Sequence, residues 1–149
     1  MGPSGKVIGI DLGEKRVGVA ISDELRFAHP LCVIIWQNLD KTMDTLMSLA
    51  KENEAESFVV GLPRNMDGTM GKGAKQAVRF ARRLHAKSNL PVALCDERLT
   101  TSQAEKEMIG LGKSRRRRRM TIDEAAAVLI LESYMTSVAA ATKGKDEGL

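Results

Sequence analysis

The sequence predicts an α/β fold in which a five-stranded mixed sheet carries helices on both faces. Short apolar runs typical of strands alternate, from about residue 38 onward, with segments of helical periodicity. The first three strand-like runs follow one another without an intervening helix, which predicts an antiparallel meander. The later strands follow helices, so we expect them to lie parallel to their sheet neighbours.

The run Val7-Ile8-Gly9-Ile10-Asp11-Leu12-Gly13 predicts the central strand. Its apolar residues do not alternate with polar ones, which favours a strand buried on both faces. Gly13 permits a sharp turn directly afterwards. Asp11 is therefore expected at the end of a rigid strand, where a carboxylate can hold a metal ion or face phosphates. The alternative is a turn aspartate that caps local backbone amides.

The remaining elements follow from similar patterns. We expect strands near residues 17–21, 31–36, 57–61 and 91–95, the second of these after a turn at Pro30. Helices are predicted from Asn38 or Asp40, over residues 73–87, after Thr101, and from Thr121. Residues 1–5 are predicted to be a flexible extension, residues 6–141 one domain, and residues 142–149 a disordered tail without apolar anchors.

Composition limits the possible functions. The 149 residues are 43% hydrophobic but only 3% aromatic, which argues against base-stacking surfaces that need several rings. A net charge of +4 suggests a polyanionic partner if the charges cluster. Cys32 and Cys95 lie in apolar runs without a CxxC partner and are predicted to be buried, reduced thiols. With no signal-peptide or membrane-length segment, we expect a cytoplasmic protein that does not bind membranes.

Basic residues gather in two places. Charged residues along one face of a helix usually do no more than contact solvent. Both groups here contain positive charges only, which favours contact with phosphates. The first lies on one face of the helix predicted at residues 73–87 and consists of Lys72, Lys75, Arg79, Arg82, Arg83 and Lys87. The second directly precedes Asp123 and is expected to bind nucleic acid through Arg115, Arg116, Arg117, Arg118 and Arg119.

Three acidic residues stand at predicted element boundaries: Asp11 and Glu97 at strand ends, and Asp123 at the start of the last helix. If the two strands are neighbours and the helix crosses them, the carboxylates converge and need cations such as Mg²⁺ to balance their repulsion. A pair of such ions suits attack of water on a phosphodiester. Each acid also has another explanation. Glu97 could form an ion pair with Arg98, in which case Asp96 would be the metal ligand instead of Glu97. Asp123 could be present only because a negative charge in the first turn of a helix is stabilised by the helix dipole.

Five segments resemble one family in order and spacing: GIDLG at residues 9–13, KRVGVAISD at 15–23, VGLPRNMDGT at 60–69, DERLTT at 96–101 and IDEAA at 122–126. Over residues 6–137 the chain resembles the bacterial pre-16S rRNA nucleases, also described as Holliday-junction-resolvase-like proteins. The resemblance implies a ribonuclease-H-like fold, with Asp11, Glu97 and Asp123 as catalytic ligands of Mg²⁺ or Mn²⁺. It implies processing of the 5′ end of precursor 16S rRNA. The residue 1–5 extension and the arginine run depart from the family pattern.

Several functions and residue roles remain open at this stage. The leading hypothesis is a metal-dependent endonuclease, monomeric or homodimeric, that acts on structured RNA, with ribosomal particles as a further partner. Its competitors are a resolvase of branched DNA, a non-catalytic RNA-binding assembly factor, and an ATPase, because residues 10–13 also look like the first phosphate motif of sugar kinases. Arg16 either holds the scissile phosphate or braces a hairpin. The same choice between substrate contact and turn applies to Asn65, Asp67 and Thr69, while His29 and His85 are expected to be structural.

Overall fold

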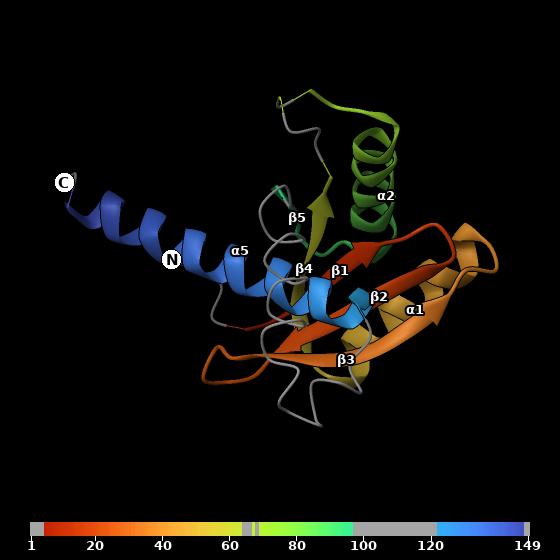
Figure 1. The fold of residues 1–149 in the computed structure, drawn as a ribbon. Coiled ribbons are helices and arrows are strands. Elements are labelled where there is room, and N and C mark those ends of the chain that lie inside the picture. Colours follow the sequence, from red (N-terminus) through yellow and green to blue (C-terminus); the bar gives the residue numbers. More distant parts are fainter. Residues whose placement is uncertain (1–4, 64–66, 68, 97–121, 148–149) are drawn as a thin grey trace, which may run out of the picture.

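The computed structural model describes residues 5–63, 67, 69–96 and 122–147, with backbone alone for residues 122, 123 and 139–147. Five strands and three helices lie in these ranges (Figure 1). In chain order they are β1 (Lys6–Leu12), β2 (Arg16–Ser22), β3 (Ala28–Ile35), α1 (Leu39–Glu52), β4 (Ala55–Leu62), α2 (Lys72–Ser88), β5 (Val92–Asp96) and α5 (Ile122–Glu147). The helix predicted after Thr101 lies outside the described residues.

The strands form one mixed sheet in the order β3-β2-β1-β4-β5. β1 pairs antiparallel with β2, and β2 pairs antiparallel with β3. β1 pairs parallel with β4, which pairs parallel with β5. The predicted meander followed by parallel strands is confirmed, and β1 lies at the centre of the sheet as its uninterrupted apolar run predicted.

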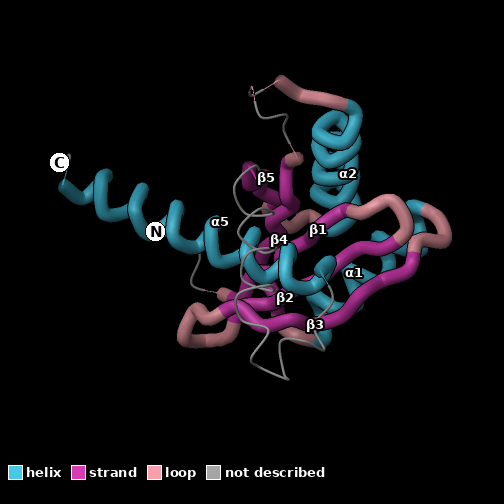
Figure 2. Tube along the Cα trace, in the orientation of Figure 1, coloured by secondary structure: helices cyan, strands magenta, loops and turns pink. Residues whose placement is uncertain are grey.

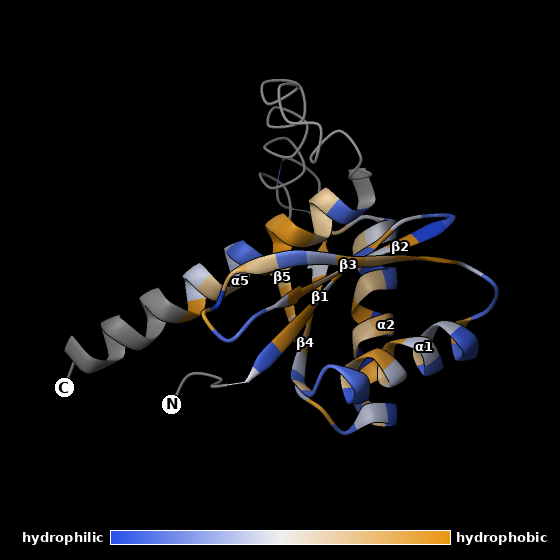
Figure 3. Ribbon diagram, turned by 90° about the horizontal axis from the view of Figure 1, so that it is seen from below, coloured by the Kyte–Doolittle hydropathy of each residue, from blue (hydrophilic) through white to orange (hydrophobic). Residues whose placement is uncertain are grey.

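The helices cover both faces of the sheet, as predicted (Figures 1 and 2). Helices α1 and α2 pack on one face, where Ile8 and Ile10 of β1 join their buried side chains. Helix α5 packs on the other face, where Val7 lies with Ile130 and Leu131. Colouring by hydropathy shows apolar strand residues between the two helical layers (Figure 3). Alternate residues of β1 therefore belong to different faces of the sheet.

Gly9 marks the place where α5 approaches β1 most tightly. A Cβ atom added at Gly9 would lie 2.9 Å from Cβ of Leu131 and 3.0 Å from the carbonyl oxygen of Ala127. Ala127 and Leu131 are both completely buried. The helix backbone thus rests almost directly on the strand, and only a residue without a side chain fits between them.

Three local predictions differ from the structure. Pro30 lies within β3 rather than before it, at a register shift between Val19 and Ala20 of β2. This is possible because β3 is an edge strand, where a missing amide hydrogen costs no ladder bond. Helix α5 runs to Glu147, whereas residues 142–149 are predicted to be a disordered tail. Cys32 and Cys95, predicted to be buried, are only half-buried.

In the described part of the chain, no helix combines the length and the apolar character that a membrane span requires.

We predict that Gly9→Ala destabilises the protein by about 1–3 kcal/mol, because the new methyl group must push α5 away from β1. Urea unfolding followed by circular dichroism measures the change. Gly73→Ala is the matched control: its Cβ would meet Cγ of Pro63 at 3.3 Å. Alanine also raises helix propensity there, so we expect a change below about 1 kcal/mol. Equal stability of the wild type and Gly9→Ala would contradict the close packing of α5.

Candidate active site

Asp11 lies near the end of β1 with its side chain on the α5 face. Ile8 and Ile10 belong to the core beneath α1 and α2, whereas Val7 packs against α5 and Gly9 contacts it. Strand alternation places Asp11 on the same face as Val7 and Gly9. Its side chain is half-buried, so it lies at the rim of the interface with α5 rather than inside the core.

Two glycines flank Asp11 on this face. Gly18 of β2 is its direct partner in the antiparallel ladder. On the other side, Gly61 of β4 follows Val60, the parallel partner of Ile10. Both glycines are buried and share the α5 face with Asp11 by alternation along their strands. The neighbouring strands thus place no side chain directly beside the carboxylate on this face, and we call these two positions the glycine floor.

Asp123 lies in the first turn of α5, four residues before Ala127. Helix α5 runs opposite to β1 (Figure 1). Stepping back from Ala127 to Asp123 covers about 6 Å at 1.5 Å per residue. The step along β1 from Gly9 to Asp11 covers about 6.6 Å at 3.3 Å per residue. Because Gly9 and Ala127 are in contact, the backbone of α5 begins over the part of β1 that carries Asp11.

The end of β5 lies two strands away from Asp11. The sequence leaves open whether the strands of Asp11 and Glu97 are neighbours, and in the structure β4 lies between β1 and β5. Two strand spacings amount to about 9.6 Å. Ala93 and Cys95 pack on the α5 side and Val92 on the opposite side, so alternation turns Asp96 away from the face of Asp11. Glu97 itself lies outside the described residues.

Trp36 holds the turn between β1 and β2 in place. Its indole Nε1 donates a hydrogen bond of 2.8 Å to the carbonyl oxygen of Gly13, and its backbone amide donates one of 3.0 Å to Lys15. The amide of Gly13 donates to the carbonyl oxygen of Arg16 at 2.9 Å and closes the turn. The exposed Arg16 begins β2 on the α5 face by alternation, the face that carries Asp11.

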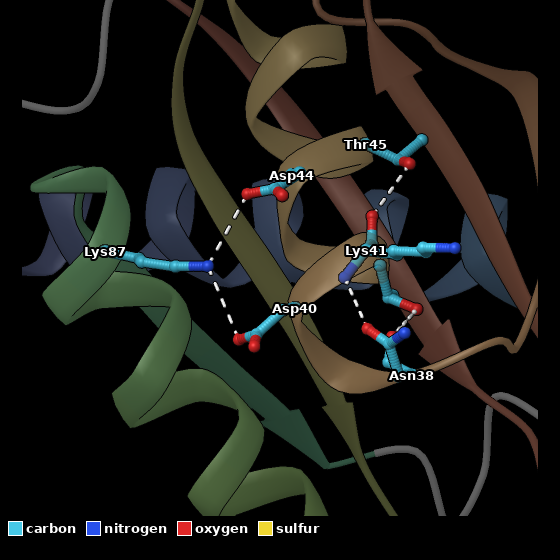
Figure 4. Close-up of polar contacts among 7 residues, drawn as sticks. Asn38, Asp40, Lys41, Asp44, Thr45 and Lys87 are labelled. Atoms are coloured by element: carbon cyan, nitrogen blue, oxygen red, sulfur yellow. Dashed lines mark hydrogen bonds and ion pairs between the residues drawn. The ribbon is translucent and has the colours of Figure 1, made fainter.

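The predicted basic stripe lies on α2. All six of its cations are exposed, whereas Ala74, Ala77, Ala81 and Leu84 are buried, as the amphipathic pattern predicted. One end of the stripe is neutralised by α1, because Nζ of Lys87 lies 3.5 Å from carboxylate oxygens of Asp40 and of Asp44 (Figure 4). Lys72, Arg79, Arg82 and Arg83 instead line a groove beside the β1–β2 turn.

The following contacts of other candidate residues are local. Oδ1 of Asp67 accepts hydrogen bonds from the amide and the hydroxyl group of Thr69, at 2.9 and 2.6 Å, which stabilise the turn. His29 pairs with Asp23 at 2.7 Å, and His85 contacts the carbonyl oxygen of Leu90 at 2.8 Å. The His29 contact, followed by backbone hydrogen bonds, lowers the pKa of Asp23. Outside the described residues lie Asn65, Arg98, Arg115, Arg116, Arg117, Arg118 and Arg119.

Sequence reasoning missed the glycine floor, although a signal for it is present. Gly18 and Gly61 each interrupt an apolar, strand-like run. Glycine weakens a strand interior and often marks a place where another group approaches the backbone closely. A pair of such glycines in different strands carries no information about their proximity until the sheet order is known.

Comparison with known proteins connects this arrangement to nucleases. The sequence model of the RuvX family, described as "Holliday junction resolvase", matches residues 5–137. A protein of Moorella thermoacetica named "Putative pre-16S rRNA nuclease" is 44% identical over 131 residues, which covers 87% of this chain and 94% of the relative. A protein of a Geobacillus species with the same name is 42% identical over 135 residues, which covers 89% of this chain and 98% of the relative.

Solved structures support the same fold. RuvC of Thermus thermophilus, in complex with a Holliday junction substrate, matches with a TM-score of 0.59 at 16% identity, covering 92% of this chain and 96% of RuvC. The fowlpox virus Holliday junction resolvase matches with a TM-score of 0.55 at 16% identity, covering 89% of this chain and 99% of that chain. At these identities the likeness establishes a ribonuclease-H-like fold, as the sequence predicted.

We predict that Trp36→Phe loosens the turn beside Asp11. The substitution keeps an aromatic ring near Phe80 but removes the donor to Gly13, so the free energy of unfolding should fall by about 0.5–1.5 kcal/mol. Hydrogen exchange of the Gly13 amide should accelerate in the same variant. Trp36→Leu, which removes both the donor and the ring, should cost more than Trp36→Phe. Wild-type exchange at Gly13 in Trp36→Phe would show that the indole does not hold the turn.

Proposed function

The chain belongs to the RuvX family, and we propose that it is a metal-dependent endonuclease that processes the 5′ end of precursor 16S ribosomal RNA. A RuvX model matches residues 5–137, and relatives above 40% identity carry the name pre-16S rRNA nuclease. One structural observation carries the proposal: Asp11 stands between two glycines on a rigid strand, under the start of a helix that brings Asp123. Such a position fits a carboxylate that serves chemistry better than one that caps a turn.

The donor set fits a hard divalent ion. We propose Asp11, Glu97 and Asp123 as the ligands, because carboxylate oxygens are the ligands that Mg²⁺ and Mn²⁺ prefer. Gly61 puts no side chain between Asp11 and the end of β5, and a spacing of about 9.6 Å suits carboxylates that reach toward two ions rather than toward each other. Divalent ions at such a site activate water and neutralise charge on the phosphate. Asp96, on the opposite face by alternation, is not part of this set.

The chain's own residues position the substrate. The exposed Arg16, on the Asp11 face of β2, is proposed to hold the scissile phosphate, for which a guanidinium group is well suited. The fixed turn below it keeps this arginine in register with Asp11. Cations of α2 are proposed to bind neighbouring phosphates, together with Arg98 and the residue 115–119 arginine run. The pair Asp67 and Thr69 is left out of the binding set because its contacts build a turn.

Ribosomal RNA is proposed as the substrate because the relatives at 42–44% identity are named for it. The likeness to RuvC, at 16% identity, concerns the fold and does not favour branched DNA. Processing of a ribosomal RNA precursor places the protein in the bacterial cytoplasm, with ribosomal particles as partners. A monomer or a homodimer is compatible with this role.

We predict that Asp11→Asn abolishes cleavage of a precursor 16S RNA in Mn²⁺ or Mg²⁺ while the protein stays folded. The loss should exceed about a hundredfold, since even outer-shell partners of metal sites contribute 10- to 100-fold. Gel analysis of a 5′-labelled precursor measures the rate, and circular dichroism checks folding. Glu97→Gln and Asp123→Asn should behave in the same way. Asp96→Asn, next to Glu97 but on the opposite face, is the matched control and should cleave at nearly the wild-type rate.

Three outcomes would change this assignment. Cleavage by folded Asp11→Asn at the wild-type rate would remove Asp11 from the reaction. Symmetrical nicking of a four-way DNA junction, with no cutting of precursor RNA under either metal, would make the chain a resolvase. Salt-sensitive RNA binding without cleavage under any divalent ion would make it an assembly factor.

A second prediction concerns the glycine floor. Gly61→Val places a branched side chain between Asp11 and the end of β5, so we expect a fall in kcat of at least about tenfold with little change in KM. Gly61→Ala, the smaller step, should lose less activity. Thermal unfolding of both variants separates this effect from misfolding. A folded Gly61→Val protein with wild-type kcat would mean that the floor need not stay clear.

A further inference from the structure

A groove of about 1030 Å³ lies beside the β1–β2 turn, on the α2 face of the sheet. It opens between the end of β1, the start of α1 and the exposed face of α2. Its lining includes Leu12 and Gly13 from β1 and the turn, Trp36 and Leu39 before and within α1, and Pro63 after β4. Asp11 is not among the described residues that line the groove, and it faces the opposite side of the sheet.

One wall of the groove is strongly basic. Lys72, Arg79, Arg82 and Arg83 of α2 line it, and all four are exposed. Lys72, Arg79 and Arg83 follow at helical spacing and project from nearly the same side of α2. Glu14 is the single acidic residue among the described residues that line the groove. Four cations against one carboxylate favour a ligand with several negative charges in a row.

The floor of the groove contains an aromatic pair. The rings of Trp36 and Phe80 meet edge to face, with centroids 6.1 Å apart and planes at 85°. Trp36 is half-buried, lines the groove, and is held by its hydrogen bond to Gly13. The scarcity of aromatics argued against base stacking, but the fold brings together two of the chain's few aromatic rings at this place. A fixed indole in a basic groove is a suitable platform for one base.

The groove adjoins the candidate active site across β1. Asp11 and Leu12 are neighbours in the strand, and alternation sends their side chains to opposite faces of the sheet. Asp11 faces α5, whereas Leu12 lines the groove. A polymer that crosses the end of β1 at the turn would therefore reach the carboxylate on one face and the basic wall on the other.

We propose that this groove holds a single-stranded nucleic acid segment that continues from the scissile phosphate, with one base stacked on Trp36 and its phosphates paired with the cations of α2. The inference rests on the proposed nuclease function and names the form of substrate it takes. A duplex keeps its bases stacked inside the helix and presents none of them to Trp36, whereas a single strand leaves its bases free. The groove thus selects cleavage sites that are flanked by unpaired nucleotides.

Trp36 is the only tryptophan of the chain, so its fluorescence reports on the groove directly. The test uses the full chain with Asp11→Asn, in EDTA, so that no cleavage occurs during binding. We expect a single-stranded RNA of about ten nucleotides to quench this fluorescence, because stacking changes the environment of the indole. A hairpin duplex of the same length should leave it nearly unchanged. Binding of the single strand, measured by anisotropy, without any change in tryptophan fluorescence would overturn the proposal.

Charge variants test the basic wall. For the double variant Arg79→Gln/Arg83→Gln, we expect a smaller salt dependence of single-stranded RNA binding. The slope of the logarithm of the binding constant against the logarithm of the salt concentration should fall in magnitude by about 1.4, because each lost phosphate contact on a single strand lowers it by roughly 0.7. Lys41→Gln/Lys51→Gln, in α1 and away from the groove, removes the same charge and should leave the slope almost unchanged. Glu14→Gln should tighten binding a few-fold because it removes a repulsive carboxylate. Equal slopes in the two double variants would contradict the proposed phosphate contacts.

Cleavage assays separate this proposal from the nuclease assignment. With active-site residues intact, Trp36→Leu should raise KM for a substrate with an unpaired flank roughly tenfold more than KM for a fully paired substrate, because loosening of the turn acts on both substrates but loss of stacking acts on one. If the two KM values change by the same factor, the groove proposal fails and the nuclease stands. If the single strand quenches Trp36 fluorescence but nothing is cleaved in any metal, the groove stands and the nuclease assignment fails.

Discussion

The close approach of α5 to β1 at Gly9 determines the candidate site. A Cβ atom added at Gly9 would lie only 2.9 Å and 3.0 Å from atoms of α5, so the helix is packed directly against the strand at this point. That position sets the level at which α5 begins, and hence places Asp123 over the end of β1 that carries Asp11. Any side chain at Gly9 would meet α5 at these distances and would require the helix or the strand to move. The tight packing at Gly9 thus determines where α5, and with it the backbone of Asp123, lies relative to Asp11.

The glycines on the α5 face of the sheet have different roles. Gly9 admits the helix, whereas Gly18 and Gly61 keep the floor on both sides of Asp11 free of side chains. Each weakens its strand, since glycine loses more entropy on folding and packs no side chain. The central position of β1, paired on both edges, compensates for this weakness. The glycines therefore lower the local stability of the sheet beside Asp11, whereas the strand pairing on both sides of β1 keeps the strand that carries Asp11 rigid.

Local patterns predicted much of this fold and less of the site. The uninterrupted apolar run of β1 and the amphipathic spacing of α2 depend on nearby residues, and both were recovered. The place of β4 between β1 and β5 depends on pairing between distant segments, which no short pattern encodes, so the sequence leaves open whether the strands that lead to Asp11 and Glu97 are neighbours. The local sequence predicts a turn at Pro30. Its actual place within β3 is possible only because β3 is an edge strand, and the strand order cannot be inferred from residues near Pro30. The meeting of Trp36 and Phe80, 44 residues apart in the chain, could not be foreseen for the same reason.

The two faces of β1 divide the tasks of a nuclease between them. Chemistry needs carboxylates held close together, and their negative potential repels the phosphates of the substrate. Binding needs cations, and of those proposed in the described part of the chain only Arg16, which is to hold the scissile phosphate, lies on the face of Asp11. Alternation along the strand separates the α2 cations from Asp11: Asp11 faces α5, and Leu12, one residue later, faces the basic groove. Phosphates can then be attracted by α2 without its cations neutralising the acids, and a flexible single strand bends across the end of β1 more readily than a duplex.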